Sequence, residues 1–530
     1  MPELFAQLMR QDFAEIEAAT ASWKKLAKTL DDTQAGSRRR VSGPLHKAGW
    51  TGAAATNGFE AMEATETKLG TGQRNALLIS VVLHTLTTKM QAAQRKLRNA
   101  VSDAERAGHT VRDDGWVEAK QAVDPAYHND PDYQGVQQQA NSGLGGFRAR
   151  IDEAVGEAVS VSSNAAETLR QLDPFDLDKR YGGENVQKDA ATVAAFAGID
   201  PKDIPDGKDP QRSKDWWAGL DDEKRGFYLA AYPDAIGALD GLPTPVRDHA
   251  NRDVLDQRLN DYALRESSLG YHDRYGYRGL TALKDRLETS DSGPANKQLY
   301  LLGFGTEKDG RAIVALGNPD TARHTAVLVP GTDTQLDKFG GQINRIGKLQ
   351  DAAATWSSGA GSDVSVISWM DYDAPEPDGS VATTARADAG AEDLRDFTHG
   401  LRAAHQGEPT HLTVVGHSYG STMTGAADAG GAGLGADDVL VVGSPGLTVE
   451  HADQLHVAPS HLWVGAAKDD MIANYTSGLT LGEDPKEPGF GAQRMFVDTS
   501  GHSGYWDEGS KSLNNQGRII AGMTPEGPRS

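Results

Sequence analysis

Apolar side chains recur at helical spacing through the N-terminal part of the chain. In the first stretch they stand three, four or seven positions apart, at Phe5, Met9, Phe13, Ile16, Trp23, Leu26 and Leu30. A second stretch carries a similar stripe, formed by Phe59, Met62, Leu69, Leu77, Leu83, Leu86, Met90, Leu97 and Val101. Residues 34–52 between them are rich in Gly and Ser and predict a break. Two such stripes predict an antiparallel hairpin of amphipathic helices.

Beyond Lys297 the apolar positions form short, β-branched runs, each ended by Gly, Pro or Asp. The predicted strands are Gln298–Gly303, Ala312–Leu316, Thr325–Val329, Val364–Trp369, Leu412–Val415, Val439–Val442, Leu462–Val464 and Met495–Val497. A hairpin-like connection joins the first two, whereas later runs are separated by segments long enough for a helix. This alternation predicts the α/β class, with a mostly parallel sheet covered by helices on both faces. Eight strands with an antiparallel start resemble the layout of the α/β-hydrolase fold.

The segment between these two patterns is polar and is punctuated by Gly, Pro and Asp, which predicts short helices and loops. A longer helix is expected around Gly146–Leu172. We therefore expect an all-α hairpin over residues 1–110, a helical and linker region over residues 111–265, and an α/β-hydrolase domain over residues 266–530.

The net charge of the chain limits the kinds of partner that we expect it to bind. The chain has 53 Lys and Arg against 75 Asp and Glu, a formal net charge of −22. A protein that binds the phosphate backbone needs a basic face, so we expect no nucleic-acid partner. The same balance disfavours a polybasic membrane anchor.

The absence of cysteine and the composition of the N-terminus exclude several further classes of protein. The chain has no cysteine, which excludes disulfides, thiol nucleophiles and Cys-ligated zinc. Because it also has no HExxH, Walker A or Rossmann pattern, we expect no metal and no cofactor. The N-terminus lacks the regions of a standard signal peptide, and the apolar stretch Asn75–Leu86 is too short to span a bilayer. We expect no stable membrane anchor, and a protein that is cytoplasmic or exported without a standard signal.

The fifth predicted strand ends in a motif that carries chemistry. Gly416-His417-Ser418-Tyr419-Gly420 is a G-x-S-x-G that follows an apolar strand and precedes a small-residue segment suited to a helix. This strand–turn–helix setting is the one required of a nucleophile elbow, which lifts a serine hydroxyl above the sheet. A serine that only caps a helix beside tightly packed glycines is the alternative.

The partners that a nucleophilic serine needs lie downstream, in the order serine, acid, histidine. Asp469 and Asp470 follow the seventh predicted strand, and His502 follows the eighth. Loops at the carboxyl ends of parallel strands open into the same crevice. We expect His502 to be the general base and Asp470 to orient it, because Asp-x-Ile resembles the acid turn of many hydrolases. Asp469 remains the alternative acid.

An oxyanion hole requires two backbone donors directed at the reacting oxygen. One is expected to be the amide of Tyr419, directly after the serine. The other is expected in the loop after the third strand, where Thr332 is favoured and Gly331 is the alternative. His417 is expected to pack beneath the elbow rather than to act as the base.

Two resemblances add to these predictions. Trp50-Thr51-Gly52 in the expected hairpin connection resembles the Trp-x-Gly turn of the WXG100 family of small helical hairpins. That family is associated with type VII secretion, so the resemblance implies an exported enzyme or effector. A tryptophan packed at an ordinary helical bend is the alternative.

The C-terminal part resembles the actinobacterial DUF1023 alpha/beta-hydrolase family. The resemblance rests on WWAGL, YPDAIGALDGLPTPVRDHANR, LVPGTDT, SWMDYDAP, VVGHSYGS, VVGSPG and GHSGYW, between about Trp216 and Trp506. It implies the α/β-hydrolase fold and a Ser-Asp-His site, carried here by Ser418, Asp470 and His502. It implies no particular substrate.

Together these features predict a serine hydrolase that transfers an acyl group to water. A small-molecule carboxylic ester is the expected substrate, with amides and thioesters as alternatives. A second hypothesis is a non-catalytic interaction protein on a hydrolase scaffold. In that case the hairpin would dock a helical partner or a second copy of the chain through its apolar stripe.

Overall fold

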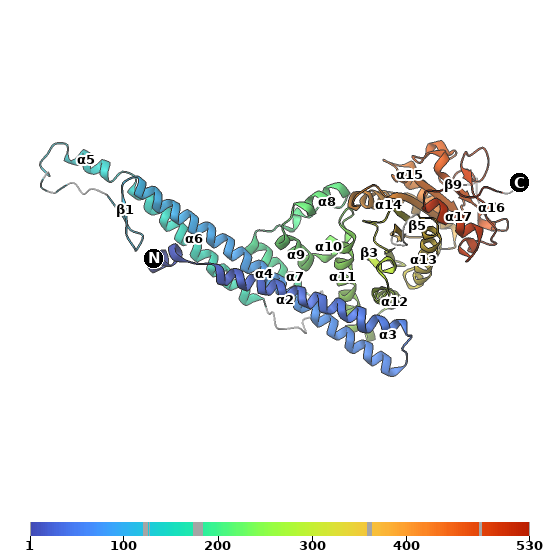
Figure 1. Ribbon diagram of the computed structural model, residues 1–530, viewed down its shortest axis with the longest axis horizontal. Coiled ribbons are helices and arrows are strands. Elements are labelled where there is room, and N and C mark those ends of the chain that lie inside the picture. Colours follow the sequence, from blue (N-terminus) through green and yellow to red (C-terminus); the bar gives the residue numbers. More distant parts are fainter. Residues whose placement is uncertain are drawn as a thin grey trace.

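The computed structural model describes residues 2–119, 124, 126, 128–172, 184–357, 363–475 and 480–528. A long helical arm, a middle layer of shorter helices and a mixed sheet follow one another along the chain and across the molecule (Figure 1). The helices of the arm are α1 (Pro2–Arg10), α2 (Ala14–Ser37), α3 (Gly43–Lys47), α4 (Ala53–Arg106), α5 (Tyr133–Ala140) and α6 (Leu144–Gln171).

The predicted hairpin is present, since α2 and α4 pack side by side along much of their length. The predicted break at residues 34–52 is too long. A π-helical turn, Arg38–Ser42, and α3 carry the helical conformation to Lys47, so the chain reverses only over residues 48–52. Tertiary contacts stabilise this Gly-rich segment as helix, which local composition could not reveal. Trp50 lies at the reversal and packs on Phe59, with ring centroids 5.4 Å apart.

Helix α4 is the spine of the arm. Its C-terminal half packs on α6, where Leu97 and Ala100 share a core with Ile151 and Val155. By length and composition alone α4 could also cross a membrane, although a core helix passes the same test. In its most apolar window, 44% of the residues are buried inside the protein.

The middle layer covers the apolar stripe of the hairpin. Its helices are α7 (Glu184–Ala197), α8 (Pro210–Gly219), α9 (Asp222–Ala231), α10 (Pro233–Ala238), α11 (Thr244–Leu264) and α12 (Tyr271–Asp291). Leu83 and Leu86 of the predicted stripe are partly buried against a core of this layer, which contains Val193, Trp217 and Phe227. The chain therefore supplies its own partner for this part of the stripe.

The sheet has eight strands in the order β10-β9-β8-β7-β5-β6-β4-β3. They are β3 (Leu299–Gly305), β4 (Arg311–Leu316), β5 (His324–Val329), β6 (Val364–Met370), β7 (His411–His417), β8 (Asp438–Val442), β9 (Leu462–Gly465) and β10 (Gln493–Arg494). Strand β4 pairs antiparallel with β3 and β6, and all other pairs are parallel. The predicted α/β-hydrolase layout, with an antiparallel start and a parallel remainder, is confirmed.

Helices cover both faces of the sheet. As a result β6 and β8 are buried along their whole length, and β5 and β7 at all but their first residue. The helices of this part are α13 (Gly340–Ala354), α14 (Ala385–Ala404), α15 (Tyr419–Ala429), α16 (Met471–Tyr475) and α17 (Lys511–Ile520). One core joins α13 and α17 to one face, and a second core joins α14 and α15 to the other.

The last strand differs from the prediction. Met495–Val497 was expected to pair, but β10 comprises Gln493–Arg494. Met495 is buried in the core and its amide still donates to the carbonyl of Val464 in β9, at 3.0 Å. The amide of Phe496 donates to the carbonyl of Glu526 instead of to a neighbouring strand. These residues are apolar because they pack, so their pattern placed the strand too far along the chain.

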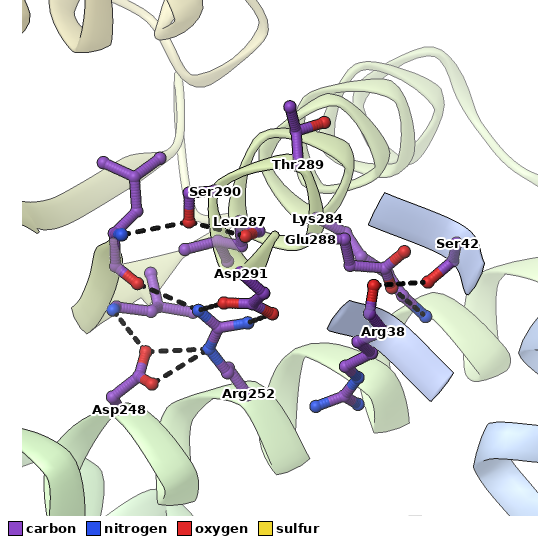
Figure 2. A network of polar contacts seen from close by, with 12 residues as sticks. Arg38, Ser42, Asp248, Arg252, Lys284, Leu287, Glu288, Thr289, Ser290 and Asp291 are labelled. Atoms are coloured by element: carbon purple, nitrogen blue, oxygen red, sulfur yellow. Dashed lines mark hydrogen bonds and ion pairs between the residues drawn. The ribbon is translucent and has the colours of Figure 1, made fainter. Parts of the chain in front are cut away.

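Buried charges join the hairpin to the middle layer. Arg38, which is 9% exposed, forms ion pairs with Asp256 of α11 and with Glu66 of α4, the latter at 3.4 Å. Lys284 of α12 reaches the other oxygen of Asp256 at 3.0 Å. Figure 2 shows Lys284 beside Glu288, and, deeper in the layer, Arg252 held between Asp248 and Asp291.

Replacing Arg38 by Ala is expected to destabilise the docked hairpin by ~3–5 kcal/mol, because Asp256 and Glu66 would stay buried with less compensation. The measurement is the urea midpoint of the full chain, followed by circular dichroism. Lys28→Ala is the control, since Lys28 forms an exposed pair with Asp32 and should barely move the midpoint. Equal effects of the two substitutions would contradict a structural role for the buried pairs.

Candidate functional site

Ser418 stands at the turn between β7 and α15, as the motif predicted. Its backbone has φ 55° and ψ −131°, a region that non-glycine residues rarely occupy. The turn is tight on both sides: a Cβ on Gly416 would lie 2.7 Å from the Cα of Ser421, and one on Gly420 would overlap the carbonyl of Val329. The two glycines of the motif are therefore required by close packing of the backbone around the serine.

Asp470 and His502 form a pair at the carboxyl end of the sheet. Nδ1 of His502 lies 2.9 Å from Oδ1 and 3.0 Å from Oδ2 of Asp470, whose side chain is fully buried. The hydroxyl of Tyr505 donates to Oδ2 at 2.5 Å, and the amide of Ile472 donates to Oδ1 at 2.9 Å. Burial by itself would raise the pKa of Asp470, but the hydrogen bonds from His502 and Tyr505 outweigh it and hold the pKa at about 2. The carboxylate is therefore ionised at neutral pH.

Asp469 occupies a different position. It is exposed and accepts a hydrogen bond from the amide of Gly501 at 2.8 Å, so it contacts the loop that carries His502 rather than the imidazole. Of the two candidate acids, the structure brings Asp470 to the histidine ring.

His417 supports His502 from below, a contact that the sequence did not specify. Its Nε2 lies 2.9 Å from the carbonyl oxygen of His502, and its ring packs on Trp506 with centroids 4.8 Å apart. Burial, together with the nearby charges of His502 and Arg345, lowers the pKa of His417 to about 3. A neutral His417 that donates from Nε2 therefore fixes the backbone of His502. In the sequence, the only indication that His417 packs in this way was its place at the end of a predicted buried strand.

The expected oxyanion residues surround the serine. A Cβ on Gly331 would lie 2.6 Å from Cβ of Ser418 and 3.0 Å from the amide nitrogen of Tyr419, so this loop lies directly against the elbow. Tyr419 is the first residue of α15, and its amide has no acceptor within the helix.

Two side chains that the sequence did not assign to the site brace the loop after β5. The hydroxyl of Tyr372 donates to the carbonyl of Pro330 at 2.6 Å, and the hydroxyl of Thr334 donates to the carbonyl of Gly331 at 2.7 Å. These hydrogen bonds occupy two carbonyls of the loop, and the amide of Asp333 donates to the carbonyl of Pro375 at 3.1 Å. The amides of Gly331 and Thr332 have no acceptor among the described residues, so they are the donors available to a ligand.

A cavity of about 830 Å³ opens over these residues. Gly331, Thr332, Ser418, Tyr419 and His502 all lie in its wall. Further lining residues are Asp333, Thr334, Lys338, Gly341, Gln342, Arg345, Pro377, Asp378, Val381, Ala382, His417, Pro445, Ile472, Thr480, Leu481 and Ser503. The volume is in the range of small-molecule binding sites. Within the described part of the chain, no group of three or more His, Asp and Glu is placed to hold a metal ion.

Comparisons with known proteins agree with this architecture. A family model described as alpha/beta hydrolase matches residues 306–480, which include Ser418 and Asp470. The uncharacterized protein Rv2079 of Mycobacterium tuberculosis is 32% identical over 428 residues, which cover 70% of this chain and 64% of that protein. The chain thus spans slightly less than two thirds of the length of that relative.

A second relative is covered more completely. The uncharacterized protein Mb0988c of Mycobacterium bovis is 32% identical over 225 residues, which are 41% of this chain and 82% of that protein. Three findings agree on the alpha/beta-hydrolase architecture: the strand order, the turn at Ser418 and the matching family model. The chain therefore belongs to the alpha/beta-hydrolase family and is a homologue of these mycobacterial proteins.

Proposed function

We propose that this protein is a serine hydrolase that cleaves carboxylic esters with Ser418, His502 and Asp470. The observation that carries the proposal is the hydrogen-bonded pair of His502 with the buried Asp470, because His502 lines the same cavity as a serine held at positive φ. A serine hydroxyl needs a base to become nucleophilic, and an imidazole needs an acceptor on Nδ1 to present Nε2 as that base.

In the proposed reaction each of these groups has one role. Oγ of Ser418 attacks the carbonyl carbon of the ester while Nε2 of His502 takes its proton. The ionised carboxylate of Asp470 keeps the proton on Nδ1 and stabilises the imidazolium that forms. The amide of Tyr419, with that of Thr332 or Gly331, donates to the oxyanion of the tetrahedral intermediate.

Collapse of this intermediate breaks the bond to the alcohol, which leaves with the proton from His502. Water then attacks the acyl-serine with His502 again as base, and release of the acid restores the serine. Esters are the proposed class because the wall near the serine contains Val381, Ile472 and Leu481, against which an acyl chain can be buried.

A fluorophosphonate probe tests the activated serine directly. We expect one adduct per chain by intact mass, mapped to the peptide that contains Ser418. His502→Ala should abolish the adduct, because the hydroxyl would lose its base. His272→Ala is the matched control, since His272 is an exposed histidine on α12. An adduct elsewhere, or equal labelling of the His502 variant, would reject the proposal.

A further inference from the structure

Arg345 is an unusual charge in the wall of the catalytic cavity. It projects from α13, and its guanidinium carbon lies 4.5 Å from the centre of the Trp506 ring. Its one hydrogen bond among the described residues is to Oε1 of Gln342, at 3.4 Å. Within that part of the protein no carboxylate pairs with it, although the whole chain has more acidic than basic residues. Burial alone lowers the pKa of Arg345.

The other charges of this cavity are already satisfied. Lys338 pairs with Asp333 at 2.9 Å. Asp378 is exposed at the rim, and its carboxylate accepts from the amide and the hydroxyl of Ser380. Neither Asp333 nor Asp378 pairs with Arg345. A partly buried guanidinium without a counter-charge is costly, which is the condition that an anionic ligand would relieve.

Gln342 adds a second donor beside it. Gln342 stands three residues before Arg345, on the same face of α13, and only 7% of its surface is exposed. Since Oε1 accepts from Arg345, Nε2 points away from the arginine, and no hydrogen bond of Nε2 is found among the described residues. The side chain lines the cavity, so its amide group can reach a ligand bound there.

Both donors lie close to the reacting groups. Trp506, on which Arg345 stacks, also packs edge-on against His417, and His417 contacts the carbonyl of His502. The charge of Arg345 is close enough to help keep His417 neutral. A group held by Arg345 would therefore lie in the same cavity as the bond that Ser418 attacks.

We propose that Arg345 and Gln342 bind an anionic group of the substrate, a carboxylate or a phosphate, so that the preferred esters carry such a group near the scissile bond. This inference rests on the proposed ester hydrolysis. The planar guanidinium can donate two parallel hydrogen bonds to either anion, and the amide of Gln342 can donate a third. Recognition is local, because the acidic surface gives an anion no long-range steering.

Matched pairs of esters test the inference. The acyl side is probed with the mono-para-nitrophenyl ester of adipic acid against para-nitrophenyl hexanoate. The leaving-group side is probed with para-carboxyphenyl butyrate against para-carbamoylphenyl butyrate. We expect the full chain to prefer the anionic member of one pair, and the responsive pair identifies the side that carries the anion.

Arg345→Met should lower that preference, the ratio of the two kcat/KM values, by roughly tenfold to a hundredfold, as expected for lost hydrogen bonds to a charged group. The loss should appear mainly in KM, because the anion is bound in ground state and transition state alike. Arg345→Lys should restore part of it, since the charge remains but the planar fork does not. Arg95→Met is the control and should leave the ratio unchanged, because Arg95 is exposed on α4 and does not line the cavity.

Binding is measured separately from chemistry, as the rise in melting temperature that each uncleaved anionic ester gives to the Ser418→Ala protein. A rise that Arg345→Met removes supports the anion site even if no ester is hydrolysed, and in that case only the proposed hydrolysis fails. Hydrolysis of both members at equal kcat/KM, with Ser418 labelled by the probe, overturns the anion site and leaves the proposed hydrolysis standing. Absence of both turnover and ligand-induced stabilisation overturns the anion site too.

Discussion

Replacing Ser418 by Ala is expected to lower kcat on the best ester by roughly 10⁶-fold, with His502→Ala equally damaging. The two side chains act as one unit, because the hydroxyl is a poor nucleophile without the imidazole and the imidazole has no proton to take without the hydroxyl. The measurement is kcat under saturating ester with protein purified free of host esterases.

The double variant provides the internal control. Because both residues act in the same step, Ser418→Ala combined with His502→Ala should be no slower than either single variant. Circular dichroism should be unchanged, since both side chains line an open cavity. The prediction would be contradicted if the fold-reduction in kcat of the double variant were the product of the two single reductions. It would also be contradicted if the Ser418→Ala protein kept a tenth of its activity. Either result would assign catalysis to other groups.

Replacing Asp470 by Asn is expected to lower kcat by roughly 10⁴-fold. An amide nitrogen facing Nδ1 would favour the tautomer that protonates Nε2, and His502 could then no longer accept the proton of Ser418. The charge that stabilises the imidazolium would be lost as well. Asn is the suitable substitution because it keeps the shape of the side chain. With its oxygen in the place of Oδ1 it can still accept from the amide of Ile472, and the hydroxyl of Tyr505 can accept from the nitrogen that replaces Oδ2.

Asp469→Asn is the matched control for this prediction. Asp469 is exposed and accepts only from the amide of Gly501 among the described residues, a bond that an Asn oxygen can also accept. We expect kcat to change less than threefold, in line with a contact outside the reacting groups. The reverse order of effects would make Asp469 the triad acid and would mean that the loop rearranges when substrate binds.

Local sequence patterns were sufficient for most of the sheet. The runs at Val364, Leu412 and Val439 are apolar on both faces, and such runs become buried parallel strands almost wherever helices alternate with them. Met495–Val497 was misplaced because its apolar residues pack into the core, whereas the paired edge residues Gln493–Arg494 are polar and exposed and gave no strand signal. The length of the break at residues 34–52 was overestimated because Gly and Ser indicate only a low local helix propensity. In the structure, tertiary contacts hold Arg38 and Ser42 in helical conformation.

The candidate site also has a part that local sequence predicts and a part that it does not. Gly416-x-Ser418-x-Gly420 is a local motif, since the overlaps that demand its glycines arise within the turn and from the strand beside it. The choice between Asp469 and Asp470 is not local, because the two stand in the same turn and differ only in which one is buried against His502 and Tyr505. His417 was likewise expected to pack beneath the elbow, but its contact with the carbonyl of His502 became visible only in the structure. The same holds for the hydrogen bond from Tyr372 to the loop after β5.

The sequence by itself determined the α/β class, the hairpin and the serine turn, because each follows from the spacing of neighbouring residues and from backbone sterics. Only the tertiary structure decided which carboxylate meets the histidine and where the hairpin docks. It alone also placed Arg345 in the wall of the cavity beside Ser418, with no paired carboxylate among the described residues. These outcomes depend on burial and on distances between residues far apart in the chain, and hydrophobic spacing carries no information about either.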